Sequence, residues 1–264
     1  MLSYSILETF DLQIDSHTIV SPDIPANFDG IRIVFVTDIH YGPIIGKKKL
    51  ADLLQQVQLL KPHLFLLGGD YIQSKMPQKR QLRYLNELMA GLKQVRAPLG
   101  KFGVLGNHDH DEVGAEETRV AMRMAKIRPL DNEATWIWKG FQRIRLGGVG
   151  DLWFDKQFLE PTLKPVKDDD FVILLSHQPQ FVDKINKAKI DLMLTGHTHG
   201  GQVVPTNRLP FKKGMLKKKR VKGWIQVNQT ELLISNGIGV EFPYIRIFNR
   251  PQIHFITLQR QEVY

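Results

Sequence analysis

The sequence predicts a mixed α/β fold in which two mixed β-sheets pack face to face as a sandwich flanked by helices. Early in the chain, apolar runs of strand length alternate with amphipathic runs of helix length, whereas the later part consists mostly of short strand-like runs. The chain has 264 residues, and neither an internal repeat nor a low-complexity linker divides it. Because sheets and helices bury their apolar faces against one another, we expect residues 1–264 to form a single domain that the strands within 200–264 complete.

The first half of the chain is expected to alternate between strands and helices. Residues 31–36 are β-branched and nearly all apolar, which is typical of a buried central strand. Residues 47–60 and 78–95 carry apolar side chains at helical spacing, and in the second of these runs Leu82 and Leu85 are expected to face the core. The other expected elements are irregular strand segments at 12–14 and 18–20, strands at 64–67 and 103–105, and a helix at 112–126.

The second half of the chain is expected to consist mainly of strands. Residues 171–175 form an apolar run of strand length. A polar region rich in loops is expected at 150–170, and a short helix at 180–187. The other expected strands lie within 134–149 and at 190–194, 202–204, 224–227, 232–234, 244–248 and 253–258.

The composition narrows the chemistry that is open to this chain. There are no cysteines, which excludes disulfides, thiolate zinc sites and a thiol nucleophile. Any metal would therefore be held by His, Asp, Glu, Asn or backbone oxygen, a donor set that suits manganese, iron or zinc. Lys and Arg number 36 against 27 Asp and Glu, and the resulting net charge of +9 attracts phosphates, nucleic acid or anionic lipid surfaces.

The sequence favours a cytoplasmic location. No apolar run approaches the roughly 18 residues that a membrane-spanning helix needs. The first residues, Met-Leu-Ser-Tyr-Ser, have neither the basic region nor the apolar region of a secretory signal peptide. We therefore expect a cytoplasmic protein without a transmembrane segment, and peripheral contact with a membrane is the alternative.

Metal-capable side chains directly follow five of the expected strands. A single Asp after a strand is more often a turn or helix cap, and a single His is more often hydrogen-bonded. Five such junctions in one chain favour a common site, because the carboxyl ends of neighbouring strands in α/β folds lie together. The residues are Asp38 and His40; Asp70; Asn107, His108 and Asp109; His177; and His197 and His199.

These side chains suit a centre that holds two metal ions. Two cations about 3.5–4 Å apart need a shared anion to offset their repulsion, and Asp70, at a glycine-framed strand end, suits that role. Asp38 and His40, two residues apart, can face one cation, and Asn107 offers an amide oxygen to the other. The imidazoles come from His177, His197 and His199, whereas His17, His63, His110 and His254 stand outside the pattern.

In their order along the chain, the motifs resemble those of a known superfamily. The series Asp-x-His, Gly-Gly-Asp, Gly-Asn-His-Asp, a lone His after a strand, and Gly-His-Thr-His spans residues 38–199 and resembles the calcineurin-like metallophosphoesterases. Gly-His-Thr-His-Gly-Gly-Gln at 196–202 and Tyr-Ile-Arg-Ile-Phe-Asn-Arg-Pro-Gln-Ile at 244–253 are similar to the bacterial branch with the YkuE- and YaeI-type phosphodiesterases. The similarity runs from about residue 28 to about residue 258 and implies the metallophosphoesterase fold.

The resemblance also implies a set of roles for the site residues. A hydroxide that bridges two metal ions, with manganese favoured, would attack phosphorus, and His108 would stabilise the transition state or protonate the leaving oxygen. The superfamily commonly continues Gly-Asp-x-x-Asp, where the second Asp orients this His, but here the position is Gln73. We expect His108 to be a weaker acid here or to pair with Asp109 or another acid. The implied metal ligands are Asp38, His40, Asp70 and His199 for one ion, and Asp70, Asn107, His177 and His197 for the other.

A basic segment follows the last metal motif. Eight of the fifteen residues at 208–222 are Lys or Arg, and none is acidic. One interpretation is a solvated loop, and another is a clamp for an anionic substrate, with Arg208, Lys212 and Lys213 as its candidates. The apolar residues between the basic ones are typical of segments that touch anionic membranes. Contact with nucleic acid is less favoured, because no nucleic-acid-binding signature accompanies the segment.

The sequence therefore favours a metal-dependent phosphohydrolase. The expected substrate is a small phosphodiester or a pyrophosphate-linked compound, with lipid-linked phosphates and nucleotide sugars among the candidates. A nuclease of the same chemistry is one alternative, which the basic segment would serve. A non-catalytic binding scaffold with the same fold is the other, although every candidate ligand and His108 are present.

Overall fold

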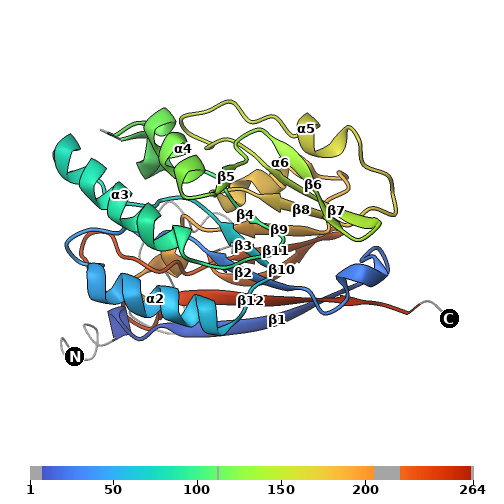
Figure 1. Ribbon diagram of the computed structural model, residues 1–264, viewed down its shortest axis with the longest axis horizontal. Coiled ribbons are helices and arrows are strands. Elements are labelled where there is room, and N and C mark those ends of the chain that lie inside the picture. The colour runs from blue at the N-terminus through green and yellow to red at the C-terminus, as the bar shows by residue number, and fades with distance from the viewer. Residues whose placement is uncertain (1–7, 112, 205–220, 263–264) are drawn as a thin grey trace.

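The protein is built on two β-sheets that face each other (Figure 1). The computed structural model describes residues 8–111, 113–204 and 221–262, and each sheet has six strands within them. The first sheet has the order β1 (Gln13–Ser21), β12 (Gln252–Arg260), β2 (Arg32–Val36), β3 (Leu64–Leu67), β4 (Lys101–Gly103) and β5 (Arg128–Pro129). The second has the order β10 (Gly223–Val227), β11 (Thr230–Ile234), β9 (Leu192–Thr195), β8 (Val172–Leu175), β7 (Gln142–Gly148) and β6 (Ala134–Lys139).

Both sheets are mixed, as the sequence predicts. Strands β2 to β5 run parallel, and β12 is antiparallel to β2 but parallel to β1. In the second sheet, β7, β8, β9 and β11 are parallel, and the edge strands β6 and β10 are antiparallel to their neighbours. The central parallel strands of each sheet therefore finish at the same end of that sheet, where the loops that follow them can bring distant residues together.

Helices cover the outer faces of the two sheets. The first sheet carries α2 (Lys47–Leu59), α3 (Gln78–Lys93) and α4 (Ala115–Met124), and the second carries the short helices α5 (Glu160–Leu163) and α6 (Val182–Ile185). Single 3₁₀ turns complete the described elements: η1 (Ala26–Phe28), η2 (Asn107–His110), η3 (Pro179–Phe181) and η4 (His199–Gly201). Within the described ranges, no helix combines the length and apolar character that crossing a membrane requires.

Alternation along the central strands fills the apolar layers. In β2, Ile33 and Phe35 point into the layer between the two sheets, where they join residues such as Ile173 of β8. Val34 and Val36 point the other way and pack in the layer beneath α2, α3 and α4. Because successive side chains of a strand face opposite sides, a strand buried on both faces must be apolar throughout, which is why residues 31–36 could be recognised.

The expected element positions are wrong in several places. Leu82 is 37% exposed, and Gln81 takes the inward position on α3, where its Oε1 accepts from the Val113 N–H at 3.3 Å. A polar side chain can be buried when it has a hydrogen-bond partner, and the spacing of apolar residues along a helix does not reveal such a partner. The strand expected at 103–105 lies earlier, as β4, and the two segments expected at 12–14 and 18–20 belong to one continuous strand, β1, which begins at Gln13.

Two late segments expected as strands are loops. Residues 202–204 and 244–248 contain no named strand and are joined by a single bridge between Val203 and Ile247. Polar side chains in these segments form hydrogen bonds with backbone groups that belong to no β-sheet. Arg246, for example, is fully buried and donates to the Gly239 carbonyl oxygen. The region 150–170 is mostly loop, as expected, but includes the four-residue helix α5.

Candidate metal centre

Five loops at the carboxyl ends of strands bring the predicted site residues together. Four of these loops directly follow strands that are almost entirely apolar and buried, and the fifth follows β4, whose three residues are also buried. The structure places Asp38 and His40 after β2, Asp70 after β3, Asn107 and His108 on η2 beyond β4, His177 after β8, and His197 and His199 after β9.

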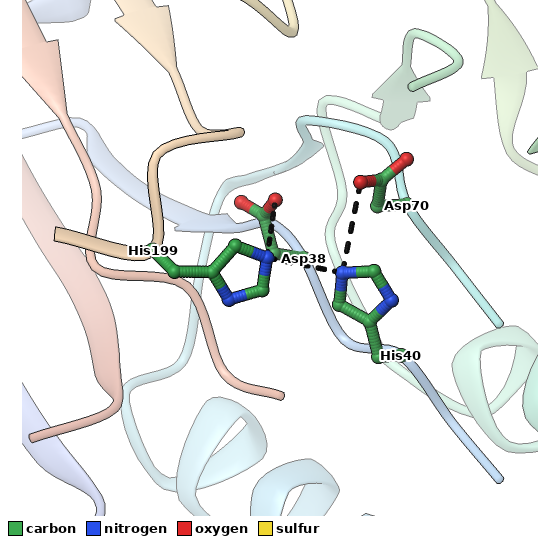
Figure 2. Close-up of side chains that lie close together, drawn as sticks. All are labelled: Asp38, His40, Asp70 and His199. Atoms are coloured by element: carbon green, nitrogen blue, oxygen red, sulfur yellow. Dashed lines mark hydrogen bonds and ion pairs between the residues drawn. The ribbon is translucent and has the colours of Figure 1, made fainter. Parts of the chain in front are cut away.

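The first cluster consists of four buried side chains, Asp38, His40, Asp70 and His199, shown in Figure 2. One possible ligand atom from each lies within 4.8 Å of all the others. The Nε2 atoms of His40 and His199 are 3.1 Å apart, and His40 Nε2 lies 3.6 Å from Asp70 Oδ2. His199 Nε2 lies 3.5 Å from Asp38 Oδ1. Two imidazole nitrogens and two carboxylates that converge in this way suit a divalent cation with mixed nitrogen and oxygen ligands.

A second cluster adjoins the first and shares Asp70 with it. Possible ligand atoms of Asp70, His177 and His197 also lie within 4.8 Å of one another. His177 Nε2 is 3.2 Å from Asp70 Oδ2, the same oxygen that His40 approaches. Asn107 reaches this cluster through its Oδ1, 3.0 Å from His197 Nδ1. The carboxylate of Asp70 therefore stands between two groups of imidazoles, where one anion can face two cations.

Five of the seven clustered residues have a left-handed backbone. Asp38, His40, Asp70, His197 and His199 have φ angles of 52°, 45°, 54°, 68° and 51°. Residues other than glycine seldom adopt such angles, and each costs about 1–3 kcal/mol. Strain that is repeated at neighbouring side chains points to a functional constraint, because each turn directs its side chain to a common centre.

Close packing around the clusters explains one glycine of the Gly-Asn-His-Asp motif. A Cβ atom at Gly106 would overlap the Asp70 carboxylate and would stand 2.7 Å from Cε1 of His177. Because real Cβ atoms do not come this near to other heavy atoms, any larger residue here would push the two side chains apart. Glycine is thus required by the approach of the β3 and β8 loops.

Hydrogen bonds behind the clusters orient the candidate ligands. His177 Nδ1 lies 2.7 Å from the Gly68 carbonyl oxygen, so this nitrogen donates and Nε2 is left to face Asp70. Asp38 accepts from the His197 N–H at 3.0 Å and from the Thr37 hydroxyl at 2.9 Å. A backbone or carboxylate partner on the second nitrogen is how proteins fix the tautomer of a metal-binding histidine.

Burial and mutual charge shift the ionisation of the clustered groups. Burial raises the pKa of Asp70, but the charge and hydrogen bond of His177 outweigh it and leave this pKa well below its usual value. Burial lowers the pKa of His177, but the charge of Asp70 outweighs it and raises the pKa to about 10. Burial lowers the pKa of His40 to about 4, which leaves this imidazole neutral. An ionised Asp70 among imidazoles is a strong attractor of positive charge, and cations compete with protons for such groups.

His108 lies beside both clusters and is held between two acids. Its backbone N–H donates to Asp70 Oδ1 at 2.9 Å. Its Nδ1 is 3.4 Å from Asp111 Oδ2, and its Nε2 contacts Oε1 of Glu241. Burial lowers the pKa of His108, but the hydrogen bond to Glu241 and the charge of Asp70 outweigh it and raise the pKa to about 9.

Neither Asp109 nor Gln73 is the acid partner of His108. The carboxylate of Asp109 accepts from the backbone N–H groups of Asp70, Tyr71 and Gly106 at 2.8–2.9 Å, so it ties the β3 and β4 loops together. Oε1 of Gln73 has no hydrogen-bond partner among the residues that the structure describes. The acids that contact His108 are Asp111 and Glu241, and the raised pKa that they help to produce also makes this histidine a weaker acid.

Several residues at the site were missed from the sequence. Glu241 belongs to none of the motifs, and it follows the His108 motif by more than a hundred residues. Trp153, in the region expected to be a plain loop, meets His197 edge to face with ring centres 4.6 Å apart. Arg246 lies under the loop that carries Glu241 and donates to the Gly239 carbonyl oxygen. The run at 244–253 was noted, but no local pattern indicates that this arginine is buried.

The remaining predicted residues divide into two groups. Arg208, Lys212 and Lys213 lie outside the described residues, so their proposed part in substrate binding stays a prediction. The four histidines that stand apart from the pattern have other partners: His254 contacts Asp15 and Ser235, His63 accepts from the Arg32 N–H, His110 is 3.4 Å from Asp155, and His17 stacks on Trp224.

Comparison with known proteins agrees with this architecture. The sequence model described as calcineurin-like phosphoesterase matches residues 31–201. The uncharacterized metallophosphoesterase YkuE of Bacillus subtilis is 29% identical over 96% of this chain and 87% of its own length. The phosphodiesterase YaeI of Escherichia coli is 30% identical over 86% of this chain and 82% of its own length. A crystal structure from Thermus thermophilus shares the fold with a TM-score of 0.52 at 13% identity, covering 79% of this chain and 90% of that one. On these matches, the chain belongs to the calcineurin-like phosphoesterase family.

Proposed function

We propose that this protein is a dinuclear metal-dependent phosphoesterase that hydrolyses phosphodiesters, with the whole chain acting as one domain. The observation that carries the proposal is the Asp70 carboxylate, whose Oδ2 lies 3.6 Å from His40 Nε2 in one cluster and 3.2 Å from His177 Nε2 in the other. A shared anion of this kind is what two neighbouring cations need. We assign Asp38, His40, Asp70 and His199 to one ion, and Asp70, Asn107, His177 and His197 to the other, with manganese as the favoured metal.

The residues around the clusters have distinct parts in this proposal. When bound, two divalent cations supply an activated water at neutral pH and positive charge for the phosphoryl oxygens. His108 donates a proton to the leaving oxygen, since its pKa of about 9 keeps the imidazole protonated near neutral pH. Glu241 contacts Nε2 of this imidazole and Asp111 lies near its Nδ1, so these two acids orient it. Gln73 has no charge with which to stabilise the protonated ring.

The substrate class is a phosphodiester or pyrophosphate-linked compound that carries an apolar group. One support is the name of the relative YaeI, a phosphodiesterase. Another is the exposed aromatic surface near the clusters, where Trp153 is 61% exposed and its neighbour Phe154 is 58% exposed. Phe242, next to Glu241, is 81% exposed. Aromatic side chains left open to solvent beside a charged centre suit substrates that combine a phosphate with an apolar body, such as lipid-linked phosphates or nucleotide sugars.

A substrate panel tests the proposed activity. Metal-reconstituted protein is expected to hydrolyse phosphodiesters or pyrophosphate-linked sugars faster than phosphomonoesters, as measured by kcat/KM for each compound. Digestion of single- or double-stranded nucleic acid at the highest rate would favour the nuclease alternative. A protein that binds metal and these compounds but turns none of them over would be a binding scaffold, and the proposed activity would be wrong.

The basic segment at 208–222 is proposed to contact anionic surfaces, with Arg208, Lys212 and Lys213 nearest the substrate. Replacing Lys217, Lys218, Lys219 and Arg220 with glutamine is expected to weaken sedimentation with phosphatidylserine-containing vesicles, because each removed charge costs about 1 kcal/mol near such a surface. Replacing four exposed basic residues of α2 and α3, namely Lys47, Lys48, Lys79 and Arg80, with glutamine is the matched control. Unchanged sedimentation of the first variant would rule out membrane contact through this segment.

A further inference from the structure

The loop after β7 is built around a buried acid. Asp151 has no exposed surface, and its Oδ1 accepts from the backbone N–H groups of Trp153 and Phe154 at 2.8 and 3.0 Å. The side chain of Gln157 donates to the Asp151 carbonyl oxygen at 2.8 Å. A carboxylate that accepts from the next two or three backbone N–H groups fixes a tight turn. The backbone that carries Trp153 is therefore held in one conformation.

This turn is fastened to one of the loops of the metal centre. Gln178 directly follows His177 and is 1% exposed. Its Nε2 donates to Asp151 Oδ2, and its Oε1 accepts from the Leu152 N–H at 3.0 Å. Both ends of one buried amide are used to join the β7 loop to the β8 loop, so the position of Trp153 is set relative to His177.

The fastened turn brings a large apolar side chain to the edge of the second cluster. The rings of Trp153 and His197 are 4.6 Å apart between centres, with an angle of 83° between their planes. Yet 61% of Trp153 is exposed, more than the 54% of Trp138, which lies on β6 opposite the start of β7. The backbone of Trp153 is thus fixed, while most of its side chain faces solvent. Exposing a large aromatic side chain forgoes the free energy of burying it, and such exposed apolar surface often marks a ligand-binding site.

We propose that Trp153 is a substrate-contact residue that selects for the organic group carried by the phosphate. The indole surface that is open to solvent packs against a flat or apolar substituent of the phosphodiester while the phosphate lies at the metal centre. Substrates with a nucleobase, aryl or long alkyl group beside phosphorus are then preferred over substrates with a small, hydrated one. This proposal rests on the proposed function, because it names which phosphodiesters the same site prefers.

The kinetic test compares diesters that share one leaving group. p-Nitrophenyl esters of methyl phosphate, decyl phosphate and thymidine 5′-phosphate release the same phenolate, so differences in kcat/KM report the other substituent. In the wild type, the thymidine or decyl ester is expected to exceed the methyl ester, and Trp153→Ala should reduce that preference roughly tenfold, the range found for stacking on an aromatic side chain. Which ester is preferred distinguishes a nucleotide from a lipid source.

Matched variants separate contact with substrate from a structural role. Trp153→Phe is expected to keep most of the preference, and Trp138→Ala, at an exposed tryptophan on β6, is expected to keep all of it. The metal content of Trp153→Ala should equal that of the wild type. An unchanged preference in Trp153→Ala would overturn the proposal, as would an equal loss of rate on all three esters accompanied by loss of metal.

A binding measurement separates this proposal from the proposed activity. Calorimetric titration of metal-reconstituted protein with thymidine 5′-phosphate, decyl phosphate and methyl phosphate measures the preference without turnover. One outcome is that no ester is hydrolysed, yet a larger phosphate binds more tightly than methyl phosphate and Trp153→Ala abolishes this difference in affinity. The proposed activity would then be wrong, but the proposed contact with Trp153 would be supported. Equal affinities of wild type and Trp153→Ala for all three phosphates would contradict the contact even in an active enzyme.

Discussion

Asp70→Asn is expected to lower kcat/KM for the best diester by at least about a hundredfold and to reduce the bound metal from two ions per chain to one or fewer. The substitution keeps the shape of the side chain but removes the charge that faces His40 and His177 from one oxygen. Removing one partner from a buried set of charges costs about 3–5 kcal/mol, which corresponds to a factor of roughly a hundred to a few thousand. Metal content by mass spectrometry and steady-state kinetics measure the two effects.

The control for this substitution is Asp191→Asn. Asp191 is also a largely buried acid, but it accepts from the Val172 N–H at the start of β8 and pairs with Lys189, away from both clusters. This variant should keep two metal ions per chain and wild-type kinetics even if it unfolds at a lower temperature. Normal metal content and activity in Asp70→Asn would refute the bridging role.

Arg246→Met is expected to destabilise the protein by about 3–5 kcal/mol, which lowers Tm by on the order of 10 °C for a chain of this size. Arg246 has no exposed surface, and burial lowers its pKa to about 10, so it is charged at neutral pH. Its guanidinium donates to the carbonyl oxygens of Asn236, Gly237, Gly239 and Asn249 at 2.6–3.3 Å. Methionine would fill much of the volume but would leave these buried acceptors without donors.

The loop that Arg246 supports also reaches the candidate metal centre, so activity should fall with stability. The Gly239 N–H donates to the Asp38 carbonyl oxygen at 2.6 Å, and Glu241 lies two residues further on. Arg246→Lys should give an intermediate Tm, because an ammonium is a compact donor that cannot serve all four carbonyl groups. Arg250→Met, at a half-exposed arginine nearby, should shift Tm by no more than about 2 °C. A Tm of Arg246→Met equal to that of the wild type, measured by calorimetry, would contradict this account.

The sequence predicts the centre of this fold better than its surroundings. Strands such as 31–36 and 64–67 are buried on both faces, so they must be apolar throughout, and the polar residue after each one marks its carboxyl end. The candidate ligands could therefore be located without knowledge of the fold. The residues that support them belong to loops, where side chains bind backbone groups of distant segments and leave no periodic pattern.

Glu241 and Trp153 illustrate what the sequence could not reveal. Glu241 reaches His108 because Gln202 binds both its N–H and its carbonyl oxygen, at 2.9 and 2.8 Å, and this pairing depends on the tertiary fold. Trp153 reaches His197 because Gln178 fastens the β7 loop. The error at Leu82 has a related origin, since Gln81 can be buried only where the Val113 N–H meets it.

The number of metal ions that each wild-type chain binds tests the central claim most directly. Metal-free protein titrated with Mn²⁺ is expected to take up two ions per chain, and electron paramagnetic resonance should show spin coupling between them, since Asp70 would bring them within about 4 Å. This account predicts two spin-coupled ions in the wild type and no spin coupling in Asp70→Asn. Saturation at one ion per chain, or two ions without coupling, would contradict it.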